Sequence, residues 1–207
     1  MADAVAPEFV QFVAAERRAG RLNAATKPGG AGEVSNPVRV PPQQLSELVR
    51  VAARRASGLF HSTKHTEVVW VAGDSEVAVG LAELNVALDD GLIHVKIPVR
   101  CDQTGAGIVE VVFAVGSPNS PGGLYASTYR RPTGPELIVS VWSEALVAFA
   151  WQCLLGLFTG IAGAVGKDAR GNVLVPVELM ATKSALEIVP MSRHRFAGSS
   201  GLRVTKA

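Results

Sequence analysis

The chain has few of the residues that usually mark a catalytic or metal-binding protein. It contains only two cysteines, Cys101 and Cys153, which are too few for a disulfide framework and make a reducing compartment the default expectation. It has no phosphate-binding loop and no Gly-x-Ser-x-Gly motif. Residues 1–20 carry early acidic side chains and no unbroken apolar segment, so we expect no signal peptide and a cytoplasmic or virion location. These absences weigh against an enzyme, and we predict no cofactor and no metal.

Charge is also scarce. Charged residues make up 18% of the chain and hydrophobic residues 48%, which predicts that partners cover part of the surface. The net charge of +2 is too small to predict attraction to nucleic acid or to a membrane. Residues 66–140 carry nine acidic and four basic side chains, whereas residues 167–207 carry three acidic and seven basic ones. An acidic middle and a basic end are typical of subunits that contact one another, or of a tail that folds over its own core.

One uncharged run, residues 145–166, organises the rest of the chain. Its length fits a membrane-spanning helix, which needs about 17–25 apolar residues, and it also fits a helix buried inside protein. Period-two patterns typical of strands lie on both sides of the run. A membrane span would separate these strands, and a single hairpin is barely stable in water. We therefore predict that residues 145–166 are buried in protein, with a membrane span as the disfavoured alternative.

Three glycines lie near one face of this predicted helix: Gly156, Gly160 and Gly163. Each glycine costs about 1 kcal/mol relative to alanine inside a helix, so packing must compensate for it. We expect another helix or a sheet to approach most closely along this face. Trp151 is the large side chain that we expect to pack beside them.

The N-terminal segment predicts a short helix on an arm. Residues 7–20 begin with a proline suited to the first helical turn, and Gly20 suits the C-terminal cap. This helix is too short to be stable alone, so we expect it to dock on its own core or on a neighbour. Residues 21–40 follow as a linker rich in glycine and proline. The residues expected to make the contact are Phe9, Phe12, Arg17 and Arg18.

Two further segments present basic side chains. Residues 42–60 form the clearest amphipathic helix, with Arg50 and Arg54 on its polar side. Residues 192–207 hold Arg193 and Arg195 without any acidic residue, which predicts an exposed basic tail. Neither segment interleaves aromatic residues with its basic ones, so we expect contacts with acidic protein surface or solvent, not with nucleic acid.

The remaining pattern predicts an α+β fold: a mostly antiparallel sheet of about seven strands packed on one long apolar helix, with two N-terminal helices on an extended arm. The domains are expected at 1–40 (helix and arm), 41–191 (a single α+β domain) and 192–207 (tail). A phase slip at Ala82-Glu83 predicts a bulge in the second strand. The strands are expected at 67–72, 76–88, 92–100, 108–115, 124–130, 136–140, 173–181 and 185–189.

Candidate chemical groups are isolated in the sequence. His61 and His65 have the spacing of a helical zinc pair but no third ligand nearby, which favours a structural role. Glu144 is a candidate general base at the start of the apolar helix, although a place near the favourable end of the helix dipole explains it more simply. His94 is expected on the outer side of its strand.

Three functions follow as expectations. The first is a non-enzymatic structural subunit of a homomeric assembly, such as a virion, injection-machine or shell component, that uses its arm and basic tail for subunit contacts. The second is a carrier for a small apolar ligand, or a membrane-associated protein, that uses residues 145–166. For the carrier, Trp151, Gln152 and Thr159 are the expected lining residues. The third and least favoured is an enzyme that uses Glu144 or His94.

Overall fold

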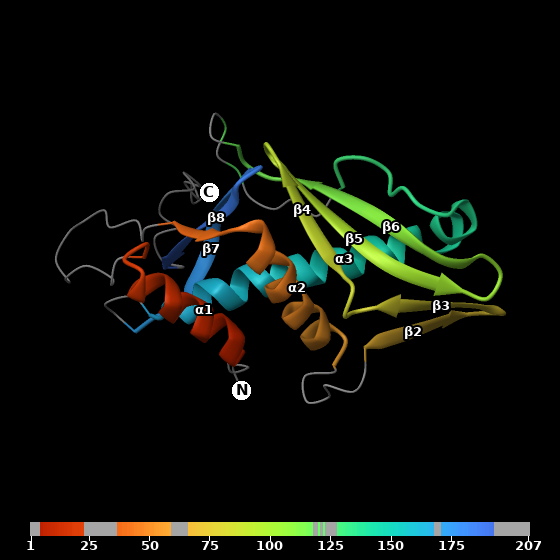
Figure 1. Ribbon diagram of the computed structural model, residues 1–207, viewed down its shortest axis with the longest axis horizontal. Helices are drawn as coiled ribbons and strands as arrows, with labels where there is room; N and C mark the ends of the chain where they lie inside the picture. Colours follow the sequence, from red (N-terminus) through yellow and green to blue (C-terminus); the bar gives the residue numbers. More distant parts are fainter. Residues whose placement is uncertain are drawn as a thin grey trace, which may run out of the picture.

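The computed structural model describes residues 5–22, 37–58, 66–117, 120, 122, 128–167 and 171–192. Over these residues the protein has an α+β fold with two antiparallel sheets and a long helix that crosses both (Figure 1). The predicted fold class is therefore confirmed, although the strands form two sheets and not one. His61, His65, Arg193 and Arg195 lie outside the described residues, as does most of the predicted strand 124–130.

The larger sheet contains the meander that the period-two pattern predicted. β5 and β6 pair along their whole lengths, and a tight turn with Gly91 at a φ of +74° joins β4 to β5. Glycine suits this position because side chains disfavour positive φ. The inward-facing positions of β5 are fully buried, which places the core on the side of the sheet that faces the long helix. The strands are β2 (Glu67–Ala72), β3 (Ser75–Gly80), β4 (Asn85–Asp89), β5 (Leu92–Cys101) and β6 (Gly105–Ala114).

The bulge expected near Ala82-Glu83 is a larger break that separates β3 from β4. Val79 of β3 pairs with Val99 of β5, whereas Asn85, six residues later, pairs with Lys96, only three residues earlier on β5. The segment between β3 and β4 therefore contains three more residues than the stretch of β5 that lies opposite it. The sequence pattern located this irregularity correctly but underestimated its size. The size depends on where β3 and β4 each pair with β5, which the pattern of one segment does not record.

The smaller sheet corrects two expectations. It has the order β1 (Val38–Val40), β8 (Ala185–Ser192), β7 (Leu174–Thr182), so the C-terminal hairpin does not extend the larger sheet as predicted. β1 lies inside the predicted linker and pairs with β8, with Val38 opposite Ile188. Backbone hydrogen bonds still join the two sheets: the Ala181 amide donates to the Gly116 carbonyl oxygen over 2.9 Å.

The long helix α3 (Glu136–Val165) starts nine residues earlier than the uncharged run. The strand predicted at 136–140 is therefore wrong, because this segment forms the first turns of α3. Its β-branched residues imitate a strand locally. Ile138, Val139 and Trp142 are nevertheless buried at helical three-residue and four-residue spacing. Pro135 precedes the helix as its N-cap.

The two N-terminal helices, α1 (Pro7–Arg18) and α2 (Pro42–Ala56), pack against α3 at its glycines. A Cβ atom built at Gly160 would lie 2.5 Å from Cε2 of Phe9, and one at Gly156 would lie 3.3 Å from Cβ of Ala52. The expected close approach along this face is thus present, and it is made by helices. At the end of α3, the side chain of Arg17 donates a hydrogen bond to the Val165 carbonyl oxygen.

Candidate functional site

One face of α3 is left uncovered and is mostly apolar. Leu137 and Val141 are each 57% exposed, and Leu155 is 43% exposed. The opposite side of the helix packs on α1, α2 and both sheets, so α3 is buried on three sides only. We call the exposed set the α3 stripe. It consists of Leu137, Val141, Ala145, Ala148, Gln152, Leu155 and Thr159, which follow one another at three-residue or four-residue intervals.

Helix α3 is also the one segment of the described chain that is long and apolar enough to cross a membrane. Half of its most apolar 18-residue window is buried inside the protein. The buried half includes Phe149, Leu154 and Phe158, which pack in the same core as the strands. A single helix of this kind is weak grounds for a membrane span, because the core helix of a soluble domain has the same composition.

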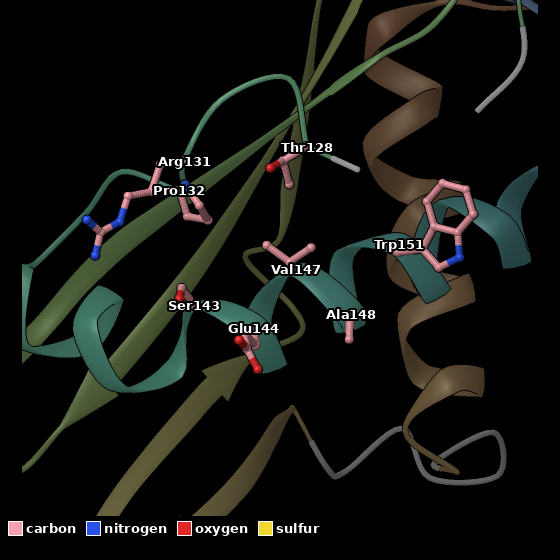
Figure 2. Close-up of a pocket in the computed structure, with 8 residues that line it drawn as sticks. All are labelled: Thr128, Arg131, Pro132, Ser143, Glu144, Val147, Ala148 and Trp151. Carbon is pink, nitrogen blue, oxygen red and sulfur yellow. The ribbon is translucent and has the colours of Figure 1, made fainter. Parts of the chain in front are cut away.

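A pocket of about 510 Å³ opens beside the α3 stripe. Its floor is the N-terminal half of α3, and the segment 128–132 forms its opposite wall (Figure 2). This wall extends the sheet beyond β6, because Thr128 pairs with Phe113 and Thr133 pairs with Glu110. The lining residues are Thr128, Arg131, Pro132, Ser143, Glu144, Val147, Ala148 and Trp151.

The polar groups of the pocket do not form a catalytic arrangement. Arg131 and Glu144 line the same pocket, but their charged groups point in different directions (Figure 2). Glu144 is exposed and lies eight residues after Glu136, the first residue of α3. The expectation that Glu144 begins the helix near the favourable end of its dipole is therefore wrong, because this effect falls off within the first turn, where Glu136 lies instead. The apolar surface comes from Val147 and Trp151, whose ring lies 6.0 Å from that of Phe113. This combination is suited to holding an apolar group beside a polar one.

The predicted lining residues of a ligand site are only partly right. Trp151 lines the pocket, as expected for a carrier. Gln152 and Thr159 lie on the exposed α3 stripe instead. The Thr159 hydroxyl donates to the Leu155 carbonyl oxygen over 2.7 Å, so it satisfies its own helix rather than a cavity.

His94 belongs to a small polar cluster on the outer side of the larger sheet. Its Nδ1 atom lies 3.3 Å from Oε1 of Glu110, and the Arg130 guanidinium donates to the other oxygen of the same carboxylate. Burial raises the pKa of Glu110, but the hydrogen bonds and charges of Arg130 and His94 outweigh it and hold the pKa below its usual value. These contacts join β5, β6 and the segment 128–133, so a structural role accounts for them. No group of three potential metal ligands occurs among the residues that the structure describes.

The aromatic residues of α1, which were expected to dock on their own core or on a neighbour, lie in the core of their own chain. Phe9 is 1% exposed and Phe12 is 8% exposed, and both belong to the central hydrophobic cluster. Arg17 and Arg18 lie on the exposed side of α1, where Arg17 also bonds to the end of α3. Within one chain, therefore, the docking helix docks on its own α3.

The basic residues of α2 have a local role that the sequence did not show. Arg50 donates from Nε to the Leu84 carbonyl oxygen over 2.8 Å, at the break between β3 and β4. The Ser46 hydroxyl accepts a hydrogen bond from the Val86 amide over 3.0 Å in β4, where Val86 lies opposite Val95 of β5. Arg54 is half-buried on α2. Helix α2 thus satisfies one backbone carbonyl at the break and one backbone amide of β4.

Sequence reasoning missed the α3 stripe, because Leu137 fell within the strand predicted at 136–140 and Val141 fell between that strand and the apolar run 145–166. Once the helix is extended to Glu136, their four-residue spacing with Ala145 becomes visible. Comparison of the chain with protein-family models, with curated proteins and with solved structures finds no match.

Proposed function

We propose that the protein is a non-enzymatic structural subunit of a homomeric assembly. The observation that carries the proposal is the α3 stripe, an exposed and mostly apolar face on the most apolar helix of the described chain, with the exposed Glu144 beside Val141 and Ala148. Large apolar side chains that share one exposed face, as Leu137, Val141 and Leu155 do, typically mark a surface that another protein or a membrane covers. Leu137 and Val141 are each more than half exposed in the single chain.

A second copy of the chain is the occupant that the charge distribution supports. Residues 66–140 are acidic in sequence, whereas residues 167–207 are basic, so each copy of the chain carries segments of opposite net charge. On α1, Arg18 is also exposed and lies outside the acidic region. Complementary potentials of this kind guide association and set its register, while the apolar stripe supplies the buried area.

Light scattering of the purified protein at micromolar concentration tests the proposal. We expect an oligomer whose mass persists from low to high salt, because burial of the α3 stripe is not screened by ions. A lysine at Val141 should shift the population toward monomer, since a charge in an apolar interface is costly. Val173→Lys is the matched control, because Val173 is 55% exposed but pairs with Lys167 beyond the C-terminal end of α3 and is not part of the α3 stripe.

Two outcomes would overturn the assembly function. The first is a wild-type monomer at every salt concentration. The second is sedimentation with membranes and release only by detergent, which would mean that lipid covers the α3 stripe. We expect the wild-type protein to stay in the supernatant after high-speed centrifugation without detergent.

A second candidate function rests on the pocket beside α3. Its volume of about 510 Å³ is within the range of small-molecule sites, which is about 300–1,000 Å³. An amphiphile with an apolar body and a polar head matches Trp151 and Val147 on one side and Arg131 on the other.

Native mass spectrometry and uptake of a fluorescent fatty acid test the carrier function. A carrier should retain a co-purified ligand or take up the probe, and Val147→Arg should abolish both by filling the pocket. Val173→Arg serves as the control at an exposed valine outside it. An empty spectrum together with no uptake by the wild-type protein would eliminate this candidate.

A further inference from the structure

One edge of the larger sheet is β2, which has no neighbouring strand on its outer side within the part of the chain that the structure describes. β2 is the last strand in the order β2-β3-β5-β4, so it pairs on one side only among the described strands (Figure 1). Its six residues pair with β3 without interruption, from Glu67 opposite Gly80 to Ala72 opposite Ser75. On the side that faces the core, the ring of Trp70 lies edge-on to that of Phe149 at 5.5 Å.

The geometry of the hairpin determines which backbone groups of β2 are free. Only Gly73 and Asp74 separate the paired residues Ala72 and Ser75, and Gly73 has a φ of +59°, as in a two-residue hairpin turn. In such a hairpin the pair next to the turn exchanges both hydrogen bonds, and hydrogen-bonded and non-bonded pairs then alternate. The amides and carbonyls of Val69 and Val71 consequently point away from β3.

The side chains at these two positions are apolar and exposed. Val69 is 51% exposed and Val71 is 68% exposed, both on the outer side of the sheet. Proteins usually protect an edge strand with proline, lysine or a bulge. β2 has none of these, and its one charged residue is Glu67 at the end, where Arg100 pairs with it at 3.1 Å. The edge therefore combines free hydrogen-bonding groups with an apolar, uncharged surface.

We propose that β2 pairs antiparallel with β2 of a second copy of this chain, about a twofold axis that passes beside Trp70. In this register Val69 of each copy lies opposite Val71 of the other, and the two tryptophans face each other on the inner side. The pairing satisfies the outward amides and carbonyls of both valines in both copies. This inference rests on the proposed assembly function and assigns one of its interfaces.

Two features select this register: which residues share a face of the sheet, and where the charge of Glu67 lies. An isologous pair must match residues of the same face, so the axis has to pass beside a residue and not between two residues. With the axis at Trp70, the only acidic residue of β2, Glu67, lies opposite Gly73 of the second copy. With the axis at Val69, Glu67 lies opposite the apolar Val71. Parallel in-register pairing would place Glu67 beside Glu67 of the second copy, and like charges directly opposite one another are destabilising.

Substitution of Val69 by proline tests the pairing without breaking the hairpin. Proline removes an amide that points away from β3, which an edge strand tolerates. Two of the four new backbone hydrogen bonds disappear, so the dissociation constant measured by analytical ultracentrifugation should rise about thirtyfold. A proline at Ile108 would disrupt β6 itself, so the matched control uses lysine instead of proline. The effect of Val69→Lys on dimerisation is compared with that of Ile108→Lys. Ile108 is 57% exposed on the same sheet and away from the β2 edge. Only Val69→Lys should dissociate the dimer.

Cysteine pairing then checks the register independently of stability. The double variant V69C/V71C should form an intermolecular disulfide on mild oxidation, because directly opposite residues have Cα atoms about 5.5 Å apart. V69C alone should not crosslink, since the two copies of that position are diagonal. The native Cys101 and Cys153 are buried, so they give little background.

The outcomes separate this inference from the assembly function. A wild-type monomer refutes both. An assembly that Val141→Lys weakens, but that Val69→Pro and Val69→Lys leave intact, refutes the β2 interface alone. Efficient crosslinking by V69C alone would also overturn it, because it would move the axis to Val69. Circular dichroism of each variant establishes that the monomer remains folded.

Discussion

Replacement of Gly160 by leucine should destabilise the protein by separating α1 from α3. The ring of Phe9 leaves no room for a side chain, because a Cβ atom at Gly160 would lie 2.5 Å from Cε2 and 2.6 Å from Cδ2. Phe9 is 1% exposed, so its ring has no solvent-facing space into which to rotate. A leucine therefore has to push the ring, and with it α1, away from α3.

The size of the effect follows from two opposing contributions. Exposing a buried phenylalanine costs about 1.5–3 kcal/mol, whereas replacing glycine by leucine inside a helix contributes about 0.8 kcal/mol of helix propensity. The net loss of unfolding free energy should be about 1–2 kcal/mol. Urea denaturation followed by circular dichroism measures this loss directly.

A double-mutant cycle isolates the contact. Phe9→Ala removes the ring, so Gly160→Leu should cost much less, or even stabilise the protein, in that background. Gly156→Ala is a milder comparison, because its new Cβ atom would lie 3.3 Å from Cβ of Ala52. If Gly160→Leu were as stable as the wild type, or if Phe9→Ala did not suppress its effect, the packing of Phe9 of α1 against Gly160 of α3 would be wrong.

Three other predictions concern groups inside the chain. Ser46→Ala should cost about 1–3 kcal/mol in urea denaturation, because the buried Val86 amide loses its acceptor; a neutral effect would contradict that role. Burial raises the pKa of the Cys153 thiol to about 12, so a thiol reagent at pH 8 should modify it only after unfolding, and rapid modification of the native protein would contradict its burial. The folded-state pKa of Glu110 is lowered, so its stabilising contribution should be present above its unfolded pKa of about 4.3 and be lost as the pH falls through the folded value. The difference in unfolding free energy between wild type and Glu110→Gln should therefore shrink from pH 6 to pH 3, and a constant difference would argue against the pairing with Arg130.

Local patterns in the sequence were sufficient for the elements whose partners lie nearby in the chain. The alternation of Ile93, Val95 and Ile97 predicted β5, and the turn at Gly91 predicted where β4 ends. The helix at the N-terminus was also visible, because Pro7 marks its start. In these segments the residue period and the turn residues act over a few positions, and no distant contact is needed to interpret them.

The glycines of the apolar run 145–166 show how far the sequence predicts a contact and where the tertiary structure is needed. Sequence alone indicated that something approaches Gly156 and Gly160 closely, since glycine in a helix must be compensated by packing. Only the tertiary structure shows that the approaching residues are Ala52 of α2 and Phe9 of α1. The identity of the partner depends on long-range geometry that the spacing of the glycines does not contain.

The sequence by itself determined the class of the fold, because residue periods distinguish strands from helices. Tertiary structure decided that the strands divide into two sheets, since β1 reaches β8 across most of the chain. It also decided that residues 136–140 are helical, because the burial of Ile138 and Trp142 against the core outweighs the local preference of β-branched residues for strands. The exposed α3 stripe and the pocket beside it follow from that same packing. Which face of a helix is covered depends on every element that reaches it, and no local pattern records this.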